Sequence, residues 1–247
     1  VFSQYDFDVI FHFAANSDVQ LGSRDTKIDI QSNFYTTRNL LEKMVEKKIL
    51  KIVFASTSAI YGSLNGKISE DQGPLFPTSL YGASKLASEA FISTYCNLFK
   101  IQSWLFRFPN VVGPRLTHGV IYDFIAKLKS NPKELEVLGN GKQEKPYIHV
   151  FDLIDAISMG YDKSQDMINF FNVGPNSTTS VEDIANFLIE RMSLSDVKIF
   201  FTGGNIGWPG DVAKFSYNTS KIREIGWAPS FSSNEAVKLA IKENLND

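Results

Sequence analysis

Residues 51–62 read KIVFASTSAIYG, and this stretch indicates the fold class most clearly. Its first half, Lys51 to Ala55, is short, apolar and rich in β-branched residues, which is typical of a central parallel strand. Hydroxyl-bearing residues follow at once, as expected where such a strand ends at the functional edge of its sheet. The stretch therefore predicts an α/β fold with a site at the strand ends.

The segments around this strand alternate between strand and helix. We predict a strand over residues 7–12, helices over 28–47 and 81–100, and a third strand over 101–106. This order predicts one half of a Rossmann-like doubly wound parallel sheet with right-handed crossovers.

Beyond Gly113 the alternation is interrupted, and a small discontinuous α/β substrate lobe is predicted. Further elements are expected as helices over 119–129, 151–162, 181–191 and 233–245, and strands over 134–138, 168–173 and 197–201. We interpret residues 1–115 as a partial Rossmann-type domain. Residues 116–247 are interpreted mainly as the lobe, with about 151–180 returning to the main sheet.

A second stretch, Tyr81-Gly82-Ala83-Ser84-Lys85, follows 24 residues after Thr57 and carries the chemistry. On a helix, residues four apart lie on one face about one turn apart, so the Lys85 ammonium is expected near the Tyr81 phenol. A nearby cation lowers the pKa of an acid, which would move Tyr81 toward use as a general base. Thr57 would then hydrogen-bond the substrate hydroxyl, although Ser56 and Ser58 are neighbouring candidates for that role.

Composition excludes several classes of protein. The net charge is −2, from 25 basic and 27 acidic residues, so no overall positive field favours nucleic acid or a membrane surface. Cys96 is the only cysteine, which excludes an internal disulfide and suits a reducing compartment such as the cytoplasm. No apolar run reaches the ~20 residues of a membrane span. The histidines are far apart and no cysteine cluster accompanies them, so no metal site is predicted, and His12 is expected to be a core residue.

Further blocks follow in order along the chain: His12-Phe13-Ala14-Ala15, Asn33, the segment from Arg107 to Arg115, Gly139 to Gln143, and Tyr147 to Asp152. Together with Thr57 and Tyr81-x-x-x-Lys85 they resemble the extended short-chain dehydrogenase/reductase family. The resemblance is to its NAD-dependent epimerase/dehydratase branch, in particular the UDP-glucose 4-epimerases.

The resemblance implies roles for individual residues. It makes Thr57, Tyr81 and Lys85 catalytic, and it implies a substrate site made of Thr57, Tyr81, Asn110, Val137, Leu138, Lys145, Trp208 and Asp211. It implies NAD contacts from Phe13, Ala14, Ala15, Asn16, Ser17, Asn33, Ala55, Ser56, Thr57, Tyr81, Lys85, Phe108 and Pro109. The family's Gly-x-x-Gly-x-x-Gly turn, which holds the cofactor pyrophosphate, is not found, so the chain is expected to begin inside the domain, and NAD is not distinguished from NADP.

Departures from the family pattern reduce the number of reactions that the chain is expected to catalyse. Dehydratases of the family carry an Asp-Glu pair after the threonine, where this chain has Ser58 and Ala59, so dehydration is disfavoured. Two phosphate-binding arginines of the epimerases are replaced by Lys145 and Trp208, which removes bidentate contacts and leaves the nucleotide open.

The resulting hypothesis is an NAD-dependent nucleotide-sugar 4-epimerase that acts through a transient 4-keto sugar. The alternatives are a reductase or dehydrogenase of a nucleotide sugar or another small carbonyl compound, and a non-catalytic sugar-nucleotide-binding protein. The resemblance also implies a homodimer through the helices that carry Asn33 and Tyr81.

Overall fold

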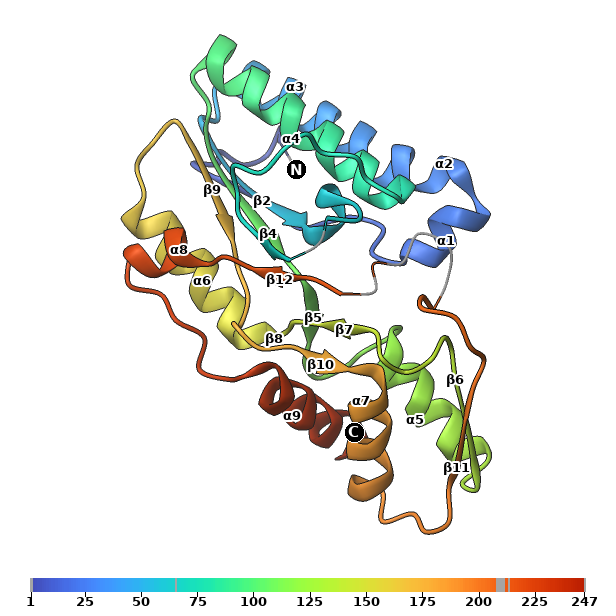
Figure 1. The fold of residues 1–247 in the computed structure, drawn as a ribbon. Helices are drawn as coiled ribbons and strands as arrows, with labels where there is room; N and C mark the ends of the chain where they lie inside the picture. The colour runs from blue at the N-terminus through green and yellow to red at the C-terminus, as the bar shows by residue number, and fades with distance from the viewer. Residues whose placement is uncertain (1, 65, 208–211, 213, 247) are drawn as a thin grey trace.

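The computed structural model describes residues 2–64, 66–207, 212 and 214–246. Within these ranges the main sheet has four parallel strands in the order β1-β2-β4-β9 (Figure 1). They span Ile10–His12, Lys51–Thr57, Gln102–Phe108 and Ile168–Asn172. The register pairs His12 with Phe54 and Thr57 with Phe108, so the carboxyl ends of β1, β2 and β4 lie at one edge.

Helices cover both faces of this sheet (Figure 1). Alternate residues of a strand point to opposite faces, so Ile52 and Phe54 pack under α3 (Thr36–Lys47) and α4 (Leu80–Phe99). Val53 points the other way, toward α6 (Val150–Lys163). Residues of β2 are therefore buried on both faces, which explains the nearly continuous apolar run in the sequence.

The helix that precedes β2 is not a regular α-helix. Residues 26–47 form α2 (Thr26–Asp29), the π-helical segment η1 (Ile30–Tyr35) and α3 without a break. The hydroxyl of Thr37 donates to the carbonyl of Asn33 at 2.7 Å inside this run. A single π turn changes which side chains face inward, and such turns are frequent at functional sites. Here it accompanies the burial of Asn33, which is 2% exposed.

The lobe packs α5 (Val120–Ser130), α7 (Val181–Arg191) and α9 (Ser233–Asn246) around one apolar cluster. The parallel pair β6 (Glu134–Val137) and β11 (Lys198–Phe201) lies beside them. Ser180 begins α7 with a capping box to Asp183, which satisfies the first free amide groups of the helix. In Figure 1 the lobe lies below the main sheet, and β5 (Asn110–Val112) runs from the sheet into it.

Short elements connect the two parts. The parallel pairs are β5 with β8 (Tyr147–His149) and β3 (Lys67–Ile68) with β12 (Ser216–Tyr217), and β7 (Glu144–Lys145) pairs antiparallel with β10 (Thr179–Ser180). Two further helices are α1 (Val19–Arg24) and α8 (Ser220–Glu224), and a 3₁₀ turn η2 (Ser58–Tyr61) follows β2.

The structure confirms the predicted α/β class and parallel Rossmann-type sheet. The predicted strand over 7–12 is shorter, because β1 forms its ladder with β2 at Ile10–His12 alone. The segment between β1 and Asp25, for which no element was predicted, contains α1, which begins because the Asp18 carboxylate caps the amides of Gln20 and Leu21. Strand β9 joins the main sheet next to β4, while the boundary at residue 115 stays a prediction. Among the described residues, no helix has both the length and the apolar character to cross a bilayer.

Candidate active site

The predicted catalytic threonine stands at the last residue of β2. Thr57 keeps an extended backbone and its hydroxyl accepts from the amide of Ala59 at 3.1 Å, which caps the η2 turn. The chain thus turns away from the sheet directly after Thr57 and leaves this residue at the edge, 7% exposed.

Helix α4 is fixed against this turn. Ser79 caps its first turn by accepting from the amide of Gly82. A Cβ at Gly82 would lie 2.4 Å from the carbonyl oxygen of Ala59, so only glycine permits this close approach of α4 to η2. The approach brings the Tyr81 phenol close enough to the Thr57 hydroxyl for the two groups to interact. Two residues that are 24 positions apart therefore meet as predicted.

The predicted acidification of Tyr81 is contradicted. Burial raises the pKa of Tyr81 to about 12, while the interaction with Thr57 lowers it and the charge of Asp29 raises it further. The Lys85 ammonium instead donates to the carbonyl oxygen of Ala55 at 2.8 Å and lies 4.7 Å from the centre of the Phe54 ring. The helical spacing predicted the face of α4 that carries Lys85. It could not show that burial of the phenol raises its pKa.

Lys85 is itself strongly perturbed. Its side chain is 3% exposed, and burial lowers the pKa of its ammonium to about 8, against the opposing effect of the Glu89 charge. His12, at the end of β1, has its pKa lowered to about 4 by burial and by the charge of Lys85. The Thr37 hydroxyl donates its one proton to Asn33, so His12 Nε2 donates to Thr37 Oγ1 at 2.9 Å, and the ring is neutral. His12 is thus a core residue, as predicted.

The segment after β1 is held by a second hydrogen-bond network. The amide of Asn16 donates to Asn33 Oδ1 at 2.7 Å, and Asn33 Nδ2 donates to Ser84 Oγ at 3.0 Å. Ser84 lies on α4 beside Lys85. Asp29, which is 1% exposed, accepts from both asparagines through Oδ1. The network therefore connects the predicted cofactor residues Asn16 and Asn33 to the helix that carries Tyr81.

The edge carries small residues at the places where a nicotinamide group would approach the main chain. Small residues stand at the strand ends, with Ala14 exposed, Ala15 half-buried and Ala55 and Ser56 directly before Thr57. Small side chains permit a flat ring to approach the main chain. Phe13 is 49% exposed and Ser17 is exposed beside them, while Phe108 and Pro109 follow at the end of β4, the latter buried. The residues present thus fit the nicotinamide end of the cofactor, and their contacts with it stay a prediction.

Apart from Thr57 and Tyr81, the described residues of the predicted substrate set lie on β5, on β7 and at the end of β6. Asn110 is exposed at the start of β5, Leu138 is 40% exposed after β6, and Lys145 is half-buried in β7. The Val137 side chain is fully buried in the lobe core, so it can meet a ligand only through its backbone. Trp208 and Asp211 lie outside the described residues. Assignment of this set to the substrate remains a prediction.

Sequence reasoning missed the buried ion pair of Glu89 and Arg107. Arg107 Nη2 lies 2.6 Å from Glu89 Oε2, and both side chains are under 10% exposed. Glu89 stands four residues after Lys85, so a search along the same helical face would have found it. Arg107 was noted within a motif but was given no partner, because its contact depends on the pairing of β4 beside β2.

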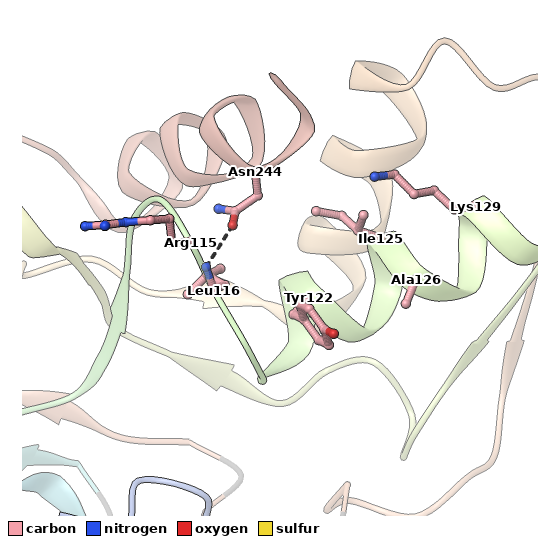
Figure 2. Close-up of a pocket in the computed structure, with 7 residues that line it drawn as sticks. All are labelled: Arg115, Leu116, Tyr122, Ile125, Ala126, Lys129 and Asn244. Atoms are coloured by element: carbon pink, nitrogen blue, oxygen red, sulfur yellow. Dashed lines mark hydrogen bonds between the residues drawn. The ribbon is translucent and has the colours of Figure 1, made fainter. Parts of the chain in front are cut away.

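One cavity of about 360 Å³ lies in the lobe, between α5 and α9. Figure 2 shows Tyr122, Ile125 and Lys129 of α5 on one side and Asn244 of α9 on the other. The amide of Leu116 donates to Asn244 Oδ1 at 2.9 Å across it. None of the predicted catalytic, cofactor or substrate residues lines this cavity. Among the described side chains, no group of three His, Cys, Asp or Glu is arranged to hold a metal.

Known proteins with similar sequences and structures indicate the family to which the chain belongs. A putative UDP-glucose 4-epimerase of Methanocaldococcus jannaschii is 29% identical, covering 96% of this chain and 76% of that protein. Human dTDP-D-glucose 4,6-dehydratase is 28% identical, covering 98% and 70%. A crystal structure of UDP-galactose 4-epimerase superposes with a TM-score of 0.87 and 36% identity, covering 96% and 77%. The model of the NAD-dependent epimerase/dehydratase family matches residues 1–174. The chain belongs to the NAD-dependent epimerase/dehydratase family.

Proposed function

We propose that the protein is a nucleotide-sugar 4-epimerase of the UDP-glucose/UDP-galactose type. The observation that carries the proposal is the placement of the Tyr81 phenol next to the Thr57 hydroxyl at the strand-end edge, with the Lys85 ammonium bound to the carbonyl of Ala55. The similarity to UDP-galactose 4-epimerase over nearly the whole chain supports the choice of substrate.

In this proposal Tyr81 acts as the phenolate, which the positive charge of bound NAD would favour against the burial that raises its pKa, and it takes the proton of the sugar 4-hydroxyl. A substrate hydroxyl bound between the Thr57 hydroxyl and the Tyr81 phenol would contact both groups and be aligned for proton transfer. When bound, NAD supplies the acceptor and later the donor of the hydride at C4, together with positive charge near the phenol. Tyr81 returns the proton to the oxygen after the 4-keto sugar has turned, so the reaction consumes no net reductant.

The turn after Thr57 favours epimerisation over loss of water. Removal of water from the sugar needs an acid and a base next to the site, supplied in dehydratases by carboxyl groups. Here Ser58 and Ala59 occupy η2, and the amide of Ala59 is committed to Thr57. Because dehydratases are among the relatives, we expect the side chains of this turn to influence which of the two reactions occurs.

The direct test is incubation of the purified protein with NAD and either UDP-glucose or UDP-galactose. We expect both incubations to reach the same ratio of the two sugars, measured by chromatography, with no accumulation of reduced nicotinamide at 340 nm. Bound NAD without interconversion would remove the substrate assignment. Stoichiometric use of reduced cofactor with a keto sugar would indicate a reductase, and release of water from dTDP-glucose would indicate a dehydratase.

We also propose a homodimer through the outer faces of η1, α3 and α4. Tyr35, Phe91, Leu98 and Phe99 are between 39% and 67% exposed there, and Phe91 packs edge-on against Phe34 at 4.8 Å. Exposed aromatic and apolar groups of this kind mark contact surfaces. Sedimentation of the protein and of a Phe91→Glu variant tests this: we expect a dimer that the charge disrupts, and a monomeric wild type would contradict it.

A further inference from the structure

Glu89 continues the face of α4 that carries the predicted catalytic residues. Tyr81, Lys85 and Glu89 are spaced by four residues, so they follow one another along one side of the helix. Lys85 and Glu89 are only 3% and 5% exposed. A charged stripe in this position faces the sheet, where an unpaired charge would be costly.

Both charges are attached to β2 directly before Thr57. The Lys85 ammonium donates to the Ala55 carbonyl at 2.8 Å, and the Ser56 hydroxyl donates to Glu89 Oε1. Two adjacent strand residues are thus bound to consecutive turns of α4. The position of Thr57 relative to Tyr81 depends on these two contacts.

Arg107 holds the Glu89 carboxylate from the neighbouring strand β4. Its Nε donates to Oε1 at 3.0 Å and its Nη2 to Oε2 at 2.6 Å, which is the bidentate geometry of a strong pair. Its Nη1 donates to the Tyr61 hydroxyl at 2.9 Å and to the carbonyl of Glu70 at 2.9 Å. A buried pair of this kind adds little net stability compared with apolar residues, so its contribution lies in what it orders.

We propose that Glu89 is a positioning residue that keeps Lys85 in its ammonium form on the Ala55 carbonyl, beneath Thr57 and Tyr81. The catalytic consequence rests on the proposed function, but the effect on Lys85 does not.

The electrostatics agree with this role. Burial lowers the pKa of Lys85 to about 8, and the charge of Glu89 acts against that decrease. The other groups that interact with Lys85 are the neutral ring of His12 on β1 and the Phe54 ring on β2. Arg107, on β4, donates to the Glu89 carboxylate, and it also donates to the hydroxyl of Tyr61 on η2. Removal of the carboxylate charge should therefore bring the pKa of Lys85 toward or below neutrality.

The test is an NMR titration of the protein with ¹³C-labelled lysine side chains, without substrate. The Lys85 signal is identified as the one missing in Lys85→Met. We expect Glu89→Gln to lower the pKa of Lys85 by about one unit, the lower end of the effect of an opposite charge within roughly 4–6 Å. Glu89→Asp keeps the charge and should restore most of the wild-type value. Glu42→Gln, an exposed glutamate on α3, should leave it unchanged.

Glu89→Gln alone leaves the Arg107 charge buried and unpaired, which can unfold the protein. The double variant Glu89→Gln/Arg107→Gln removes both charges and avoids this. We expect a smaller decrease in the pKa of Lys85 in the double variant, because the lost Arg107 charge acts on Lys85 in the opposite sense, and a wild-type or higher value in the folded double variant would overturn the proposal.

Activity provides a second, separate readout. Under the proposed epimerase reaction, the alkaline limb of kcat/KM should move to lower pH in the same variants by the same amount. If the wild type does not interconvert the UDP sugars, the proposed function fails, while the NMR titration still decides the role of Glu89.

Discussion

The strand-end edge of the main sheet and the core of the lobe bury their side chains by opposite means. At the edge, Lys85, Glu89 and Arg107 are each less than 9% exposed and are matched by hydrogen bonds. In the lobe, α5, α7 and α9 meet through aliphatic side chains such as Leu128 and Leu188. The edge gains defined positions for polar atoms, whereas the lobe gains stability from apolar area.

Because of this difference, we expect substitutions at the edge to affect mainly activity and substitutions in the lobe to affect mainly stability. A polar group at the edge has a perturbed pKa because water is excluded around it, and it has a fixed place because each partner is specific. An aliphatic side chain in the lobe contributes mainly the area that it removes from water. Substitutions in the two regions should therefore change different measurements.

The largest expected effect is on the chemistry at the edge. Tyr81→Phe removes the proposed general base, so we expect epimerisation to fall by a factor of about 10²–10⁴ with little change in thermal stability. Tyr95→Phe, a half-buried tyrosine of the same helix, is the matched control and should keep its activity. Equal activity of Tyr81→Phe and wild type would place the chemistry elsewhere.

The next effect tests whether the edge tolerates one unpaired charge. Arg107→Gln leaves the Glu89 carboxylate buried without its bidentate partner, and we expect a loss of about 3–5 kcal/mol in the free energy of unfolding. Denaturant unfolding measures it. The double variant Glu89→Gln/Arg107→Gln should recover a large part of that loss, and failure to recover would mean that the pair itself stabilises the fold.

The lobe should show the reverse behaviour. Leu188→Ala truncates a fully buried side chain of α7, and we expect it to cost about 2–5 kcal/mol in the free energy of unfolding. The turnover of the remaining folded protein should stay close to wild type, because Leu188 lies in the lobe core. Leu50→Ala, at a residue 51% exposed, is the control and should change stability little. A matching loss of turnover in Leu188→Ala would show that the two regions are coupled.

The smallest expected effect is a loss of stability at acid pH. The pKa of His12 is about 4 in the folded protein and near 6.5 when unfolded, so between these values the unfolded state binds more protons. Stability is therefore lost as pH falls from about 6.5 to about 4, by up to about 3 kcal/mol for this group. His12→Gln keeps a donor for Thr37 and should reduce the difference between unfolding free energies at pH 7 and pH 4. An unchanged pH dependence would assign the acid sensitivity to other groups.

Much of the fold was open to prediction because its signals are local. The strand at residues 51–55, the helix over 181–191 and the spacing of Tyr81 and Lys85 depend on periodicity within a few turns. The π turn at Ile30–Tyr35 was not predicted, because it follows from how Asn33 packs against Ser84 rather than from residue type. That Thr57 and Tyr81 share one site was predicted through the resemblance and not from local spacing, since the two residues lie on different elements.

By itself, the sequence determined the order of strands and helices and the face of α4 that carries the reactive groups, because both follow from local spacing and the burial of apolar runs. The tertiary structure alone decided the charge state of those groups. It raised the pKa of Tyr81, turned Lys85 toward Ala55 and placed Arg107 against Glu89. Desolvation and charge pairing depend on what surrounds an atom in space, and in this protein those surroundings come from β1, β2, β4 and α4 packed together.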